Sequence, residues 1–80
     1  MRILVAEDER NLNRLISEKL KKEHYSVDSC FNGRQALDYF AGAEYDAVVL
    51  DIMMPEMDGL EVLRRLRDKG DRTPVLLLTA

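Results

Sequence analysis

Hydrophobic residues along the chain form two recurring patterns, short unbroken apolar runs and longer stretches with helical spacing. Unbroken runs of about four residues are typical of strands that are buried on both faces of a sheet. Apolar residues that recur every three or four positions predict amphipathic helices. We therefore expect apolar strands at 3–6, 47–50 and 75–78, a weaker strand at 26–30, and helices at 10–23, near 36–42 and near 60–69.

These elements alternate in the order β-α-β-α-β-α-β. Such alternation predicts parallel strands joined by right-handed helical crossovers, with helices on both faces of the sheet. The polar content of 26–30 indicates an edge strand. If the first strand is central, the second strand lies on one side of it and the third on the other. The predicted fold class is α/β, a doubly wound parallel sheet in one domain.

Composition narrows the class of protein. The chain is 46% hydrophobic and 34% charged with a formal net charge of -3, which argues against a nucleic-acid surface. Its single cysteine, Cys30, cannot form an internal disulfide and fits a reducing compartment. No apolar stretch approaches membrane length. We expect a cytoplasmic domain that contacts neither membrane nor nucleic acid directly.

Acidic residues follow two of the predicted strands. Glu7 and Asp8 come directly after the first strand, Asp51 comes directly after the third, and Thr79 ends the last. In open α/β sheets, sites form at the carboxyl ends of strands where the strand order reverses. The sequence therefore predicts three carboxylates and one hydroxyl at one rim of the sheet.

Crowded carboxylates raise one another's pKa unless a cation neutralises them. Oxygen ligands in small number, completed by water and phosphate, suit Mg²⁺ better than a full Ca²⁺ cage. Such a metal ion would let Asp51 and an incoming phosphoryl group approach each other. A single aspartate after a strand is more often a turn or cap residue, but acidic residues at two facing strand ends favour the metal site.

Three segments carry a family resemblance. Residues 3–9 (ILVAEDE), 48–59 (VVLDIMMPEMDG) and 74–80 (PVLLLTA) together resemble the receiver domain of two-component response regulators. The match covers the whole chain in order, and it is most similar to regulators with a C-terminal winged-helix DNA-binding domain. The resemblance implies the flavodoxin-like (CheY-like) version of the predicted fold and a role in transcription regulation.

The resemblance also implies residue roles. Asp51 would accept a phosphoryl group from a sensor histidine kinase. Asp8, Asp51 and the backbone carbonyl of Met53 would hold Mg²⁺, and Glu7 would hold it directly or through water. The Thr79 hydroxyl would hydrogen-bond the phosphoryl group. Such a domain is regulatory and not an enzyme, although self-catalysed phosphorylation and slow dephosphorylation are part of its chemistry.

Further positions take supporting roles by the same resemblance. Ala80 would leave room beside the phosphoryl group, and Pro55 and Gly59 would shape the loop that aims Met53. The kinase would meet the first helix around Asn11 and Arg14.

The family's chain continues with a helix, a fifth strand and a last helix. That part supplies a lysine that pairs with the phosphoryl group and an aromatic residue that rotates, and residues 1–80 contain no counterpart of either. We therefore expect a receiver fragment with phosphotransfer lowered by roughly 10²–10³-fold. We also expect an apolar patch on the first helix, and a homo-oligomer formed through an exposed edge at 75–78.

Two other functions compete with this interpretation. A phosphatase with an aspartyl-phosphate intermediate usually carries a second acid two residues after its nucleophile, and here that position is Met53. The other alternative is a truncated or engineered fragment that self-assembles without phosphotransfer.

Several other residues fit simple structural roles. His24 fits a solvated helix end, and Cys30 fits a core or edge position. The methionines at 53, 54 and 57 fit either loop packing or a partner surface. Arg64, Arg65 and Arg67 fit a solvated helix face.

Overall fold

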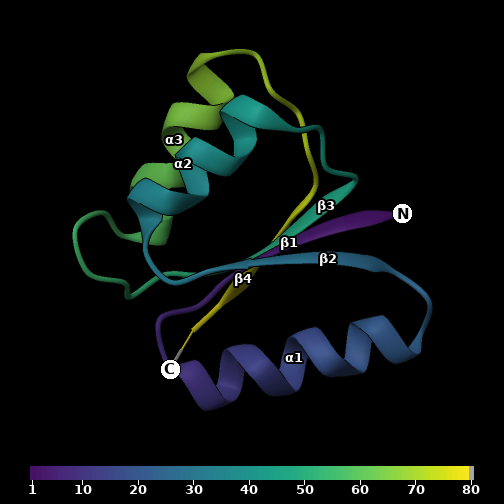
Figure 1. The fold of residues 1–80 in the computed structure, drawn as a ribbon. Coiled ribbons are helices and arrows are strands. Elements are labelled where there is room, and N and C mark those ends of the chain that lie inside the picture. The colour runs from purple at the N-terminus through teal and green to yellow at the C-terminus, as the bar shows by residue number, and fades with distance from the viewer. Residues whose placement is uncertain (80) are drawn as a thin grey trace.

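A computed structural model describes residues 1–79, so the expected role of Ala80 lies outside the described residues. Four strands form one parallel sheet in the order β2-β1-β3-β4 (Figure 1). The order confirms that the first strand is central and that the polar second strand is an edge. The elements are β1 (Arg2–Ala6), α1 (Arg10–Lys22), β2 (Ser26–Cys30), α2 (Gly33–Gly42), β3 (Ala47–Asp51), α3 (Gly59–Asp68) and β4 (Val75–Leu78).

The helices cover both faces of the sheet, with α1 on one face and the neighbouring α2 and α3 on the other (Figure 1). The main core lies between the sheet and the α2–α3 pair. Successive side chains of a strand point to opposite faces, so β1 and β3 bury alternate residues against these helices. The fully buried members of this core are Leu4, Ala6, Ala36, Val48, Leu50 and Val62.

The buried face of α1 differs from the predicted apolar stripe. Leu12 is 41% exposed and Leu15 is 59% exposed, whereas Asn13 and Ser17 are buried. The polar residues Asn13 and Ser17 therefore lie on the side of α1 that faces the sheet. The physical reason is that the Asn13 and Ser17 side chains hydrogen-bond to groups at and near the ends of β1 and β2. The expected apolar patch on this helix is present at Leu12 and Leu15.

Each helix begins with a side-chain cap at the rim where the strands end. Glu9 accepts hydrogen bonds from the backbone of Asn11 and Leu12 at the start of α1. Asn32 caps α2 and Asp58 caps α3 in the same way. Because Glu9 caps α1, the Asp8 carboxylate is not used by the cap.

A polar network at the opposite end of the sheet links β1, β2 and the segment that leads into β3. The Tyr45 hydroxyl donates to Asp28 Oδ2 at 2.6 Å, and Arg2 forms an ion pair with the same oxygen at 2.9 Å. The hydrogen bond from Tyr45, with that from Arg2, lowers the pKa of the Asp28 carboxyl. The Arg2 guanidinium also lies 5.3 Å from the centre of the Tyr45 ring. This network therefore fixes the segment before β3 against the first two strands.

The arginines of α3 divide into two kinds. Arg64 and Arg65 are exposed and pair with Glu61, as a solvated face requires. Arg67 differs from the expectation, because it is half-buried and donates to the carbonyls of Asp71 and Thr73 at 3.0 and 2.9 Å. It therefore fixes the loop between α3 and β4.

The methionines near the third strand also divide. Met54 is buried and Met57 packs against the core, so both serve loop packing. Met53 is 71% exposed. Cys30 is a core residue, and burial raises the pKa of its thiol to about 12. His24 is exposed just beyond α1, as expected.

The last strand forms an open edge of the sheet. Within residues 1–79, β4 pairs with β3 alone, and Leu76 is 62% exposed. The edge predicted at 75–78 is therefore present. Across the same described part of the chain, every helix is too short or too polar to cross a lipid bilayer.

Candidate functional site

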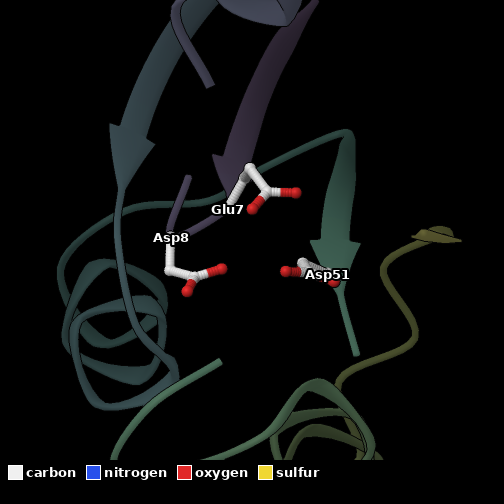
Figure 2. A group of neighbouring side chains, drawn as sticks. All are labelled: Glu7, Asp8 and Asp51. Atoms are coloured by element: carbon white, nitrogen blue, oxygen red, sulfur yellow. The ribbon is translucent and has the colours of Figure 1, made fainter. Parts of the chain in front are cut away.

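The carboxyl ends of β1 and β3 place the predicted acidic residues side by side. Ala6 and Leu50 are paired in register, so the residues that follow them, Glu7 and Asp51, are neighbours at the rim. Asp8 follows in the loop that leads to α1. Figure 2 shows the three side chains pointing toward a common space, and each offers one oxygen within 4.8 Å of the other two. The predicted convergence of the three carboxylates is present.

Glu7 is the buried member of this group, with 4% of its surface exposed. Its Oε2 accepts a hydrogen bond from the Glu9 backbone N–H at 2.9 Å. Burial, together with the neighbouring Asp8 and Asp51 carboxylates, raises the pKa of Glu7 to about 7, although the hydrogen bond from the Glu9 N–H acts in the opposite direction. A cation at the centre of the cluster would favour the charged form of all three groups.

Asp51 is held at the end of β3 by its own loop. Its Oδ1 accepts the Met53 backbone N–H at 3.2 Å, and its side chain is partly exposed. Gly59 donates its N–H to the Ile52 carbonyl at 2.8 Å, which closes the loop back onto the strand. One Asp51 oxygen is thus oriented, while the residue stays accessible to a reacting group.

Thr79 lies at the same rim of the sheet. It follows Leu78, which is paired in register with Asp51, and the Ile52 N–H donates to the Leu78 carbonyl at 3.2 Å. Thr79 is exposed. The structure therefore brings the strand ends that carry the predicted site residues to one edge, and the roles of Thr79 and of the Met53 carbonyl stay predictions.

Sequence reasoning missed Asn13, whose side chain reaches the acidic loop from α1. Its Nδ2 donates to the Glu7 carbonyl at 3.0 Å and to the Cys30 carbonyl at 2.9 Å. The available signal was the spacing of Asn13 and Ser17. Two polar residues four positions apart lie on one helix face and can share hydrogen bonds.

The family is decided by the comparison with known protein families. Residues 3–80 match the model described as the response regulator receiver domain. The chain belongs to this family. It is thus a receiver domain of two-component response regulators, and its role is regulatory.

Curated relatives of this receiver domain are longer proteins. The response regulator MprA of Mycolicibacterium vanbaalenii is 50% identical over 80 residues, which are all of this chain and 35% of MprA. The transcriptional regulatory protein DltR of Streptococcus agalactiae is 46% identical over the same 80 residues, or 36% of its length. The receiver domain therefore spans about a third of the curated relatives it matches.

A solved structure of similar fold is the response regulator TrrA of Thermotoga maritima, in complex with Mg²⁺ and a BeF group. The TM-score is 0.92 at 46% identity, and the match covers 99% of this chain and 69% of that one. TrrA has also been solved in complex with the histidine kinase ThkA, with a TM-score of 0.90. These likenesses confirm the predicted flavodoxin-like fold of the receiver domain.

Proposed function

We propose that this receiver domain accepts a phosphoryl group on Asp51, with Mg²⁺ held by Glu7, Asp8, Asp51 and the backbone carbonyl of Met53. The observation that carries the proposal is the cluster of three carboxylates whose oxygens lie within 4.8 Å of one another at two strand ends. A cluster of hard oxygen ligands fits Mg²⁺. The complex of TrrA with Mg²⁺ and a BeF group supports the same choice of ion.

The metal ion, when bound, would neutralise the carboxylates and the phosphoryl oxygens, so that two anions can approach. The chain's own residues do the rest. The Met53 N–H holds Asp51 Oδ1 and thereby sets the orientation of the carboxylate. An Asp51 oxygen attacks phosphorus, the new O–P bond forms while the P–N bond to the kinase imidazole breaks, and the imidazole keeps the electron pair. The Thr79 hydroxyl donates a hydrogen bond to a phosphoryl oxygen.

The same site accounts for the regulatory chemistry of the domain. A small acyl phosphate can replace the kinase as donor, because Asp51 is partly exposed. Water can later attack the phosphorus slowly, so that the O–P bond to Asp51 breaks, inorganic phosphate leaves and the carboxylate is restored. Both reactions belong to a domain that switches a partner's activity and turns over no separate substrate.

The proposed phosphodonor is a phosphohistidine of a sensor histidine kinase. The complex of TrrA with the kinase ThkA supports this class of partner. The proposed contact surface is α1 around Asn11 and Arg14, which are both exposed. In the whole protein, we propose that phosphorylation regulates transcription, as the name of DltR suggests for that relative. The reduced Cys30 fits a cytoplasmic location.

Incubation with acetyl phosphate and Mg²⁺, followed by intact-mass measurement, tests the acceptor. We expect a gain of one phosphoryl group that Asp51→Asn abolishes. Asp38→Asn is the matched control, because Asp38 is an exposed aspartate on α2, away from the strand ends. Unchanged phosphorylation of a folded Asp51→Asn protein would contradict the proposal.

We propose in addition that the 80-residue chain associates through the outer edge of β4. The support is the open edge and the 62% exposure of Leu76. An unpaired apolar strand offers backbone donors and acceptors to a second copy. Size-exclusion chromatography with light scattering should show a dimer that Leu76→Lys converts to monomer, since charged residues protect sheet edges. A folded monomer at all micromolar concentrations would refute this association, and association without phosphorylation would favour the self-assembling fragment.

A further inference from the structure

The Asn13 side chain lies on the buried face of α1 and is only 2% exposed. Its Nδ2 donates to the Cys30 carbonyl, at the end of β2, and to the Glu7 carbonyl, directly after β1. Both acceptors are carbonyl oxygens, which can only accept, so the amide must turn its nitrogen toward them. One side chain thus joins two strand ends at the rim that carries the acidic cluster.

The Glu7 carbonyl belongs to the peptide bond that leads into Asp8. A peptide unit is planar, so holding its carbonyl oxygen also fixes its nitrogen and the Cα of the next residue. On the other side, the Glu7 N–H donates to the Cys30 carbonyl at 3.1 Å. The peptide units on both sides of Glu7 are therefore held, the preceding one by the Cys30 carbonyl and the one that leads into Asp8 by Asn13.

Ser17 fixes the orientation of the Asn13 amide from the other side. Its hydroxyl donates to Asn13 Oδ1 at 3.2 Å, and its Oγ lies 2.8 Å from the Ser29 hydroxyl of β2. A flipped amide would turn Oδ1 toward two carbonyl oxygens and lose both hydrogen bonds. The chain of contacts from Ser29 through Ser17 to Asn13 therefore selects one rotamer, the one that holds the acidic loop.

We propose that Asn13 is a positioning residue of the metal site, which acts by orienting the Glu7–Asp8 peptide and so the spacing of the two carboxylates. The inference rests on the proposed function, because it assigns Asn13 a role toward the Mg²⁺ that Glu7 and Asp8 would hold. Residues that orient metal ligands through hydrogen bonds change metal affinity without touching the ion.

Mg²⁺ titration of the isotope-labelled chain, followed by NMR, tests the proposal with Asn13→Leu, which keeps the number and branching of the side-chain heavy atoms and removes both hydrogen bonds. We expect Mg²⁺ affinity to fall roughly 10- to 100-fold. Tyr45→Phe is the matched control, since it removes a part-buried side-chain hydrogen bond at the opposite end of the sheet. We expect it to leave the affinity unchanged. Without Mg²⁺, the amide protons of Asp8 and Glu9 should exchange faster in Asn13→Leu alone.

The outcomes separate this inference from the proposed function. If the wild-type chain binds Mg²⁺ and a folded Asn13→Leu binds it equally well, the positioning role is overturned and the acceptor site stands. If the wild type binds no Mg²⁺, both are overturned. If Asn13→Leu does not fold, NMR of the wild-type chain decides whether Asn13 has the positioning role. Couplings across the hydrogen bonds from the Asn13 side-chain nitrogen to the Glu7 and Cys30 carbonyl carbons support the role, and their absence overturns it.

Discussion

Gly59 lies against the backbone of Asp51 so closely that a Cβ atom at position 59 would stand 2.2 Å from the Asp51 carbonyl oxygen. Backbone, not a flexible side chain, occupies that space. The first residue of α3 can therefore approach the end of β3 only as glycine. This contact sets the path of the loop that starts at the proposed phosphoryl acceptor.

Gly59→Ala should destabilise the fold by about 1–3 kcal/mol, because overpacking against backbone forces the strand end or the helix to move. The same shift should lower phosphorylation of Asp51 by acetyl phosphate. Urea unfolding and intact mass measure the two effects. Gly42→Ala is the matched control, since a Cβ at position 42 meets nothing within 4 Å, and its change should stay within about 0.5 kcal/mol. If the two variants are equally stable, the close approach of Gly59 to the Asp51 backbone does not require glycine, and the prediction is wrong.

The raised pKa of Glu7 predicts a pH dependence of stability. Burial raises this pKa from 4.5 to about 7, so between these values the folded chain binds a proton that the unfolded chain releases. Stability contributed by this group is fully present below pH 4.5 and is lost as the pH rises toward 7. Without divalent ions, the free energy of unfolding of the wild type should fall across this range relative to that of Glu7→Gln.

Urea unfolding of both proteins at several pH values measures that difference. Mg²⁺ competes with the proton on Glu7, so Mg²⁺ affinity of the wild type should rise across the same pH range. If the free energy of unfolding changes with pH in the same way for the wild type and for Glu7→Gln, the pKa of Glu7 is not raised by folding and the prediction is wrong.

The network at the far end of the sheet predicts a stability effect that leaves phosphorylation intact. Tyr45→Phe removes the hydrogen bond that does most to lower the pKa of Asp28. A hydrogen bond to a charged group contributes about 1.5–3 kcal/mol, so stability at pH 7 should fall by that order. This contribution is present above the ordinary pKa of 3.8 and is lost as the pH falls through the lowered value.

Chemical unfolding and NMR titration of Asp28 check this prediction. The Asp28 pKa should rise in Tyr45→Phe. Tyr39→Phe is the control, because Tyr39 is 40% exposed and should tolerate loss of its hydroxyl. A loss of Asp51 phosphorylation in a folded Tyr45→Phe protein would show that the two ends of the sheet are coupled.

Much of the fold could be predicted from the sequence because three of the four strands contain an unbroken apolar run, and the candidate chemistry follows directly after these runs. The neighbouring ends of β1 and β3 follow from the strand order, and Glu7 and Asp51 follow from those ends. The burial of Asn13 on α1 could not be predicted from hydrophobicity. It depends on carbonyl groups at the ends of β1 and β2, which only the folded backbone brings to Asn13. The half-buried role of Arg67 likewise depends on the path of the loop after α3.

The most direct measurement of the central claim is the position of a divalent ion in crystals of the chain grown with Mn²⁺, which replaces Mg²⁺ and scatters anomalously. The account predicts one strong anomalous peak bounded by carboxylate oxygens of Glu7, Asp8 and Asp51, lost in Asp51→Asn. A folded chain with those three carboxylates in place and no peak between them would contradict it.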